Sequence, residues 1–387
     1  PHFRNNLISA QFNLHRIQRH ILHRQGSSFQ TDDIDILRTS DPNFHPTDVL
    51  EDANGDLLVI DTGGWYKLCC PSSQLENSDA FGGIYRLSAK PQNPASDPWG
   101  HHLDIATQPP ERLVAILSDE RPSLRQKAIE QIRIRGHLGD YNVKEGLLNL
   151  PSEAARRLLW ACASFSREKL THICRIGLHS DRLALQEVAA SLAGKRQLDQ
   201  LVPSLLELVS HQDFHLRRKV ISALTRIGTD AATPRIFSSL DRTTYQDEGL
   251  RHATIYYLIR CAKQADLQFY LNQSNPSHLS TAAIAITEKL GAPTSEVINR
   301  LSTLSLDWAT HPSIAWLKQR HWQFDIHDLQ SYTTATNLDP NAQNAIRSIL
   351  GRNKKSPKTL PLARQLLERS DLTNELRASL LSSLAVD

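Results

Sequence analysis

Short runs of mixed polarity, rich in β-branched and aromatic residues, mark the first 88 residues as β structure. Five runs are predicted to be strands: 7–13, 15–23, 47–52, 56–61 and 82–87. The third and fourth runs flank Ala53-Asn54-Gly55, and an Asn-Gly pair between extended segments favours a tight hairpin because it accepts the positive φ angles of the turn. Short antiparallel strands at this rhythm are typical of a sandwich, a barrel or a propeller.

From Glu111 onward the apolar spacing changes to that of helices. Two segments align on anchor residues, Leu124 and Leu216, and each anchor is followed at once by an arginine, Arg125 or Arg217. Apolar residues follow four and eight positions after each anchor, and a glycine follows twelve positions after it. This spacing gives a helix with one apolar stripe that ends at a glycine in the left-handed conformation.

The same anchor position recurs along the rest of the chain, at Ala155, Leu185, Leu250, Leu279, Ala342 and Leu376. Arginine again follows the anchor at Arg251 and Arg377. Neighbouring anchors lie 29 to 34 residues apart except for one gap of 63, which predicts a weak repeat near residues 311–320. Residues 111–387 are therefore predicted to form about nine helix pairs.

This period, with an Asp before the helix and an Arg after the anchor, resembles HEAT repeats, whose paired helices stack into an α-α superhelix. The resemblance covers residues 111–387 and is most specific at Asp119, Asp213 and Asp371. It implies an α-solenoid whose concave face binds a protein partner. We expect interior Arg and Asp side chains to tie neighbouring repeats together through charge-assisted hydrogen bonds.

A proline-rich segment, residues 89–110, is predicted to be a linker because proline removes backbone donors and restricts the preceding residue. Charge divides near the same place, with a net charge of −3 in residues 1–90 (8 basic, 11 acidic) and +6 in the remainder (36 basic, 30 acidic). A surplus of +6 over 297 residues is modest, so we expect no nucleic-acid partner.

Composition narrows the class of protein further. The 387 residues allow two or three domains, and 22% charged residues is ordinary for a globular protein. The longest apolar runs are far shorter than the roughly 20 residues of a transmembrane helix, so no such segment is expected. Five Cys do not make a disulfide scaffold, and the absence of Met leads us to expect a processed or truncated chain.

The most informative motif lies in residues 44–65, where His45-Pro46-Thr47-Asp48-Val49 precedes the Asn-Gly hairpin and Asp61-Thr62-Gly63-Gly64-Trp65 follows it. It resembles the blade signature of six-bladed sugar-dehydrogenase-type β-propellers. Together with residues 61–75 and 83–86, it looks like the end of the propeller in planctomycete-type membrane-bound dehydrogenases. Those proteins also place their propeller before HEAT repeats.

The resemblance implies a multidomain, mainly α chain in which a partial β-propeller of one to two blades, residues 1–88, precedes the HEAT-like α-solenoid. It also implies an extracytoplasmic location and a complete propeller that binds carbohydrate or oxidises a sugar or alcohol. The hydride would pass to pyrroloquinoline quinone with calcium nearby. A propeller closes only with at least four blades, so we expect this chain to be a C-terminal fragment that is inactive alone, without a cofactor of its own.

His45 and Asp48 are the candidate catalytic residues, because they lie where the inner strand of a blade would begin. One interpretation makes them a general base and its orienting carboxylate, or ligand contacts. The other is structural, with His45 fixing a loop and Asp48 accepting backbone hydrogens at the strand entry.

Two other patterns invite a metal and are interpreted otherwise. Asp52-Ala53-Asn54-Gly55-Asp56 lacks the Gly and Glu positions of an EF-hand, which favours a hairpin turn. His15, His20 and His23 alternate between the faces of a predicted strand, which favours solvated strand residues.

The cysteines and the familiar catalytic motifs add little chemistry. Cys69-Cys70 is adjacent, and both a vicinal disulfide and a pair of packed thiols stay open. Three further cysteines fall on predicted helices and are expected in the core: Cys162, Cys174 and Cys261. The sequence has no P-loop, dinucleotide-binding glycine turn, His-Glu-x-x-His helix or Gly-x-Ser-x-Gly elbow. The alternative to the propeller hypothesis is a non-enzymatic scaffold whose β segment caps the first repeat.

Overall fold

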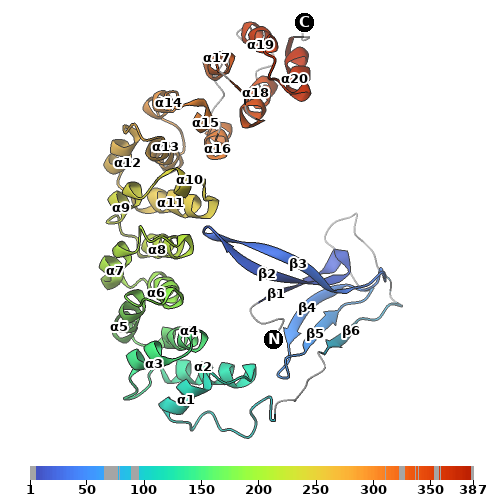
Figure 1. Ribbon diagram of the computed structural model, residues 1–387, viewed down its shortest axis with the longest axis vertical. Coiled ribbons are helices and arrows are strands. Elements are labelled where there is room, and N and C mark those ends of the chain that lie inside the picture. Colours follow the sequence, from blue (N-terminus) through green and yellow to red (C-terminus); the bar gives the residue numbers. More distant parts are fainter. Residues whose placement is uncertain are drawn as a thin grey trace. The chain divides into compact units, whose positions relative to one another are not determined.

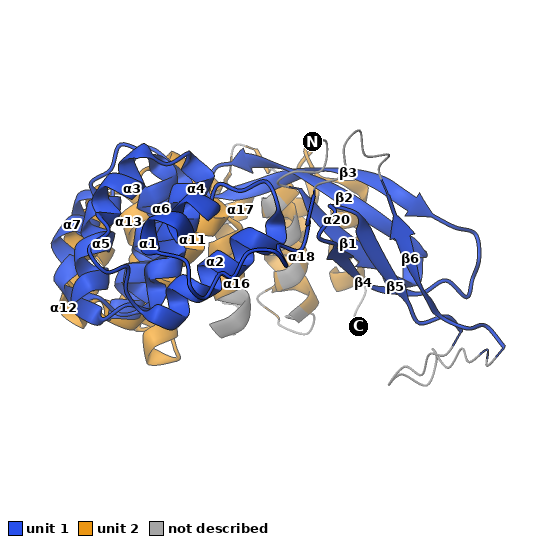
Figure 2. Ribbon diagram, turned by 90° about the horizontal axis from the view of Figure 1, so that it is seen from below, with its two compact units in different colours: residues 1–227 blue, residues 228–387 orange. Residues whose placement is uncertain are grey.

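The computed structural model describes residues 6–64, 77, 79–88, 96–309, 311–321, 327–335, 337–338, 340–352, 357 and 359–384. The chain forms two compact units, residues 1–227 and 228–387 (Figure 2). The linker predicted at 89–110 lies inside the first of these units. Cys69-Cys70 and the motif residues 65–75 lie outside the described residues.

Among the described residues of the first unit, six strands make two three-stranded antiparallel sheets (Figure 1). The first sheet has the order β1-β2-β3, with bounds Leu7–Gln11, Arg16–Gln25 and Ser28–Arg38. The second has the order β4-β5-β6, with bounds Pro46–Glu51, Leu57–Asp61 and Gly83–Leu87. The five predicted strands are confirmed, and the antiparallel β segment is as expected.

The longest strand, β3, was not predicted. It pairs with β2 through a two-residue turn in which Gln25 faces Ser28 and Gly26 adopts φ 55°. Its first eight residues are exposed to solvent, so both of its faces carry polar side chains. Polar and apolar residues alternate only over residues 33–36, and only Ile36 and Leu37 pack against the small core, which is too short a pattern to predict the whole strand.

The hairpin between β4 and β5 forms where the Asn-Gly pair predicts it. Gly55 has φ 81°, its amide donates to the Asp52 carbonyl at 2.8 Å, and the Asp52 amide donates to the Asp56 carbonyl at 2.8 Å. Arg86 on β6 binds the carboxylates of both aspartates and lies 2.9 Å from that of Asp56. The loop is thus a hairpin turn closed by a cation of the protein itself. Ile17, Phe44 and Val59 form the small core of the two sheets.

Four helix pairs follow in the first unit. Their first helices are α1 (Pro110–Ile116), α3 (Val143–Asn149), α5 (Arg167–Leu178) and α7 (Val202–Glu207). Their second helices are α2 (Pro122–Arg135), α4 (Ser152–Ala161), α6 (Leu183–Lys195) and α8 (Phe214–Ile227). Each second helix packs on the next, so these helices form one layer of the solenoid and the first helices form the other (Figure 1).

The second unit continues the pattern. Its first helices are α9 (Thr233–Ser238) with α10 (Arg242–Gln246), α12 (Gln264–Leu271), α14 (Ser295–Leu301) with α15 (Leu306–Ala309), α17 (His327–Thr333) and α19 (Thr359–Leu367). Its second helices are α11 (Glu248–Cys261), α13 (Pro276–Leu290), α16 (Pro312–His321), α18 (Pro340–Arg352) and α20 (Asn374–Leu384). Helix α16 covers the segment where the sequence predicts a weak repeat. No helix among the described residues combines the length and the apolar character that crossing a membrane requires.

The anchor residues lie on second helices and are buried. Leu124, Leu216 and Leu376 have no exposed surface, and Leu250 is 1% exposed. The residue four positions after each of the first two anchors is also fully buried, as the helical stripe requires. Gly136, just after α2, adopts φ 68° and ends that helix in the left-handed conformation.

The arginines that follow the anchors bind backbone carbonyl groups of their own repeat. Each donates to a backbone carbonyl a few residues before its own helix: Arg125 to Asp119 (2.8 Å), Arg217 to Val209 (3.1 Å), Arg251 to Tyr245 (2.7 Å) and Arg377 to Arg369 (2.6 Å). The reason is geometric, because side chains in the first turn of a helix point back toward its N-terminus.

Other side chains do join neighbouring repeats. Arg182, just before α6, donates to the Leu147 carbonyl at 2.7 Å and to the Ser152 hydroxyl at 3.0 Å. In the second unit, the carboxylate of Asp371 accepts the Leu338 amide of the preceding repeat at 2.8 Å. The expected links between repeats therefore exist, but the arginines that make them lie outside the anchor column.

Candidate functional site

The turn of the β2–β3 hairpin contacts the layer of second helices. Arg24 on β2 binds the carboxylate of Glu187 on α6, and its guanidinium lies 3.0 Å from the carboxylate of Asp213, just before α8. The Glu187 side chain is only 10% exposed, and Lys219 of α8 lies 3.7 Å from its second oxygen. Two acidic and two basic side chains thus form one compact charged cluster.

Asp213 has two roles in this cluster. Its Oδ1 accepts the backbone amide of Leu216 at 2.8 Å, so the carboxylate caps the first turn of α8. Its Oδ2 accepts the guanidinium of Arg24. The cap holds the carboxylate in place before Arg24 binds, which lowers the conformational entropy lost when the ion pair forms.

A second set of contacts surrounds His215 on α8, which is 3% exposed. Its Nε2 lies 2.7 Å from the carbonyl oxygen of Ser28 at the hairpin turn, so this nitrogen carries the proton and donates it. The ring of Phe29 lies edge-on to the imidazole, with 4.6 Å between ring centroids. The solenoid thus binds the hairpin through charge, a backbone carbonyl and an aromatic contact.

None of Arg24, Glu187 and His215 stands out in the sequence as a site residue. Their meeting depends on the β2–β3 hairpin, whose second strand is not predicted from the sequence. Asp213 does stand out, as a helix-start residue, but its contact with Arg24 joins residues that are 189 positions apart.

The candidate catalytic residue His45 is buried, at 6% exposure, in the loop before β4. Its Nδ1 lies 2.7 Å from the Gly63 carbonyl, and its amide donates to the Asp61 carboxylate at 2.7 Å. The rings of Phe12 and His15 pack against it at 4.6 and 5.2 Å. In these contacts His45 fastens the loop before β4 to the turn after β5.

Asp48, the second candidate, is exposed on β4 next to an irregularity in the strand register. Its Oδ1 accepts the amide of Val49 at 2.8 Å. The structure thus gives one candidate a buried ring with a backbone partner and the other a solvated carboxylate at the strand entry. A base and orienting-carboxylate pair between His45 and Asp48 stays a prediction.

The histidines of the first sheet each have a different partner. His20 lies 2.7 Å from both the Asp33 carboxylate and the Ser9 hydroxyl, and His23 lies 2.8 Å from the Asp32 carboxylate. His15 was expected on a strand but lies just before β2 at φ 50°, with its ring nitrogen 2.6 Å from the Phe44 carbonyl. His15 and His20 are partly buried, so the expectation of solvated strand residues holds only for His23.

The described residues contain no cluster of three or more His, Cys, Asp or Glu that could hold a metal ion. Asp52 and Asp56, the acidic pair of the hairpin, both bind Arg86, whose hydrogen bond holds the pKa of Asp52 below its usual value. Calcium at this loop would have to displace the guanidinium. The donors at this hairpin therefore do not fit calcium, and we derive no chemical step through it.

Cys162 and Cys174 pack in the core of the first unit, as expected of small apolar residues. Burial raises the pKa of Cys174 to about 12 and raises that of Cys162 as well, so both stay neutral thiols. Cys261 is partly buried, and desolvation raises the pKa of its thiol too.

A loop packs on the first repeat. Gly100, at φ 65°, approaches Leu124 so closely that a Cβ atom at this glycine would lie 2.2 Å from that side chain. Lys127 donates to the Trp99 carbonyl and Arg135 to the Ala106 carbonyl, both at 2.7 Å. Residues 96–109 therefore contact α2.

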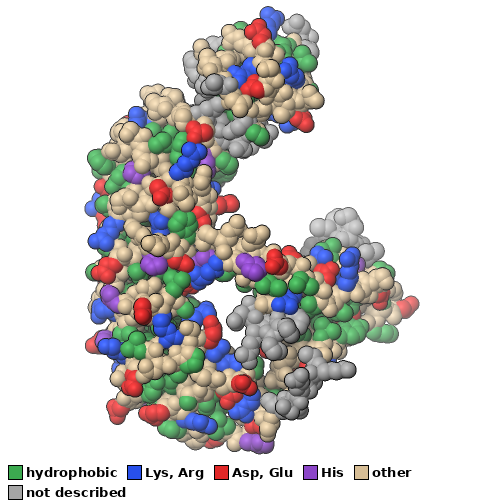
Figure 3. All heavy atoms as spheres, in the orientation of Figure 1, with side chains coloured by type: hydrophobic (Ala, Val, Ile, Leu, Met, Phe, Trp, Pro, Cys, Tyr) green, Lys and Arg blue, Asp and Glu red, His purple; other side chains and the backbone are tan. Residues whose placement is uncertain are grey.

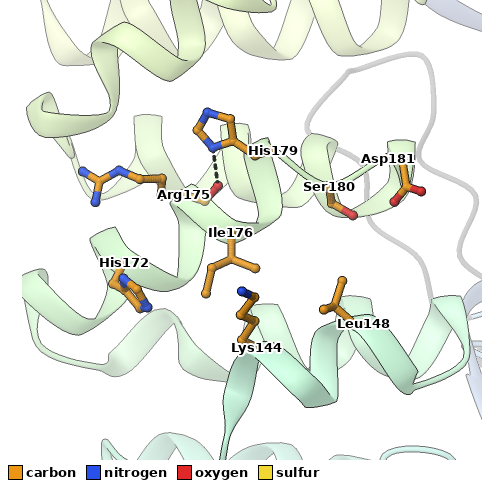
Figure 4. A pocket seen from close by; sticks show the side chains of 8 residues that line it. All are labelled: Lys144, Leu148, His172, Arg175, Ile176, His179, Ser180 and Asp181. Atoms are coloured by element: carbon orange, nitrogen blue, oxygen red, sulfur yellow. Dashed lines mark hydrogen bonds between the residues drawn. The ribbon is translucent and has the colours of Figure 1, made fainter.

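A hollow of about 360 Å³ lies between α3 and α5, on the layer of first helices (Figure 4). Leu148 and Ile176 supply its apolar surface. Its polar rim consists of Lys144, His172, Arg175, His179, Ser180 and Asp181.

Comparison with known proteins supports the helical repeats. Residues 170–259 match the family model of HEAT repeats. A comparison with curated proteins found no match. Among solved structures, the chain is similar to two engineered proteins from a structural genomics consortium. One is 13% identical, with 72% of this chain and 81% of that chain covered and a TM-score of 0.33; the other is 15% identical, with 63% and 96% covered and a TM-score of 0.24.

Proposed function

We propose that this chain is a scaffold for protein interaction whose layer of second helices binds extended β structure. HEAT repeats build continuous surfaces that bind protein partners. The observation that carries the proposal is the seating of Arg24 between Glu187 and Asp213, because it is a case of this layer binding a β-hairpin within the chain.

The chemistry of that contact resembles a small protein interface. An arginine is held by two carboxylates, an aromatic ring contacts a histidine, and a backbone carbonyl accepts a side-chain donor. Arg and aromatic residues are enriched in the anchoring positions of interfaces. Figure 3 shows charges of both signs interspersed over the repeats, which favours a protein partner over a polyanion.

Hydrogen exchange on the full chain tests the proposal. Arg24→Glu places a third carboxylate beside Glu187 and Asp213, so we expect faster amide exchange at the hairpin turn and in the first turn of α8. Arg38→Glu is the matched control, because Arg38 is exposed at the far end of β3. Equal exchange in the wild type and in Arg24→Glu would overturn the proposal.

The resemblance to sugar-dehydrogenase-type proteins extends this proposal to the β segment. In the extended form, the two three-stranded sheets belong to an extracytoplasmic propeller that binds a carbohydrate-like ligand or oxidises a sugar or alcohol. Its support is the order of the chain, with antiparallel sheets before HEAT-like repeats. Because Arg86 occupies the acidic pair of the hairpin, a calcium site would have to involve other residues.

Titration distinguishes the two forms of the proposal. A protein that carries the complete propeller before these repeats is mixed with pyrroloquinoline quinone and calcium, and dye reduction is followed with glucose and ethanol. Dye reduction that requires both additions supports the dehydrogenase form. Failure of both additions to bind leaves only the interaction scaffold.

A further inference from the structure

We propose that the groove between α3 and α5 binds an acidic peptide segment that carries a large apolar side chain. The groove lies on first helices, whereas the hairpin contacts second helices. The inference therefore goes beyond the function proposed above, and either proposal can fail without the other.

The groove is built from one face of each helix. On α5, His172, Arg175 and Ile176 are spaced three and four residues apart, and Lys144 and Leu148 are spaced four apart on α3. Residues at this spacing share a helix face. Figure 4 shows both faces turned toward the same hollow, with Ile176 pointing at α3.

The apolar surface of the groove is open to solvent. Leu148 is 50% exposed although it belongs to a helix of the repeat, and Ile176 is half-buried beside it. A Leu or Phe side chain from a partner would remove both from water, at about 25 cal/mol per Å² of apolar surface. A volume of about 360 Å³ accommodates one such side chain with its neighbours on the peptide.

The charged side chains at the rim of the groove favour a ligand of negative charge. Within the described part of the chain, the side-chain nitrogen atoms of Lys144, His172 and Arg175 have no hydrogen-bond or ion-pair partner. Cations that are free at the rim of a groove attract carboxylates and steer their approach. Asp181 lies at the opposite end from Arg175 and His172 (Figure 4). It repels a carboxylate there, so the acidic residues of the peptide must lie toward Arg175 and Lys144.

The groove is too small and too mixed in charge for a nucleic acid. Backbone recognition needs several phosphates contacted along a basic track, whereas two permanent cations and one carboxylate line this hollow. A peptide matches the groove better, because one apolar side chain can cover its apolar surface while one or two carboxylates pair with its cations.

Fluorescence anisotropy on the full chain tests the inference. The probe is fluorescein-labelled Gly-Glu-Glu-Leu-Phe-Glu-Glu-Gly, and the comparison probe is a labelled deoxythymidine decamer. We expect Arg175→Glu and Lys144→Glu each to weaken peptide binding about fivefold to tenfold, because each replaces an attraction at the rim by a repulsion. Asp181→Asn should strengthen binding about twofold to threefold by removing a like charge.

Matched controls keep the result specific. Lys195→Glu makes the same charge change at an exposed position of α6 and should leave binding unchanged. Leu148→Gln should weaken peptide binding without altering the charge of the groove. Circular dichroism melting shows whether each variant is folded. The inference is overturned if the wild type does not bind the peptide, or if Lys195→Glu weakens peptide binding as much as Arg175→Glu does. It is also overturned if the decamer binds more tightly than the peptide and loses that binding in Arg175→Glu.

Discussion

The guanidinium of Arg24 lies 3.0 Å from the carboxylate of Asp213, although 189 residues separate them along the chain. The same carboxylate caps α8, so one residue both starts a helix of the solenoid and holds the β-hairpin. This contact connects the β segment to the repeats. It is the reason for regarding the layer of second helices as a binding surface.

Leu216 tests the anchor column. It is fully buried on α8, and Leu216→Asp would place a carboxylate between packed helices. We expect a loss of about 4 kcal/mol or more in the free energy of unfolding, since a large apolar contact is lost and a charge is desolvated. Chemical denaturation followed by circular dichroism measures the change.

Ile134→Asp is the control for that substitution, because Ile134 on α2 is 69% exposed. A surface change of this kind should stay within about 0.5 kcal/mol. An unfolding curve for Leu216→Asp that coincides with that of the control would show that the anchor is misplaced.

Two glycines test how closely the second helices approach each other. A Cβ atom at Gly194 on α6 would lie 2.6 Å from the Ala223 Cα on α8, whereas one at Gly136 would meet nothing within 4 Å. Gly194→Ala must therefore push two helix backbones apart, and we expect it to destabilise the first unit by about 2 kcal/mol. Gly136→Ala should cost only about 1 kcal/mol, from its left-handed conformation.

Thermal melting of the two variants side by side decides this prediction. Gly194→Ala should have a lower melting temperature than Gly136→Ala. The reverse order would mean that a methyl group at position 194 fits between α6 and α8 without moving them.

His311 predicts a pH dependence in the second unit. Burial, with a further contribution from Arg251, lowers the pKa of this imidazole to about 4. The ring lies near Tyr245 and Trp308, and its Nδ1 is 2.8 Å from the Ser313 hydroxyl. An unfolded histidine titrates near 6.5, so the unfolded state binds the proton first as the pH falls. The stabilisation is complete above pH of about 6.5 and is lost progressively toward pH of about 4.

Melting temperatures of the wild type and His311→Asn between pH 7.5 and 5 check this sign. The difference between the two proteins should shrink as the pH falls, because only the wild type carries the titrating ring. Parallel profiles would contradict the lowered pKa.

Sequence analysis predicts the parts of this fold that have a period. The anchors Leu124 and Leu216 reveal the repeats because each buries the same helix face, and Asn54-Gly55 reveals a hairpin because the turn needs positive φ. Strand β3 is not predicted, since its first eight residues are exposed and its alternation is confined to residues 33–36. The hairpin site is not predicted either, because Arg24 lies one residue beyond the predicted strand 15–23 and its carboxylate partners lie far along the chain.

The candidate site at His45 shows a different limit. Sequence places His45 and Asp48 at the start of a strand, and in the structure His45 lies just before β4 and Asp48 lies on it. It does not reveal that the imidazole faces the Gly63 carbonyl while Asp48 faces solvent. Those directions depend on the irregular register at the start of β4 and on the rings packed against His45.

Carboxylate footprinting of Glu187 in the full chain tests the central claim most directly. Its side chain is 10% exposed under Arg24, whereas that of Glu153 on α4 is 50% exposed and serves as the internal reference. The account predicts that carbodiimide coupling labels Glu187 much more slowly than Glu153 in the wild type. It also predicts that Arg24→Glu raises the Glu187 rate several-fold, while Arg38→Glu does not. A Glu187 as reactive as Glu153 in the wild type would contradict the claim that this helix layer binds the hairpin.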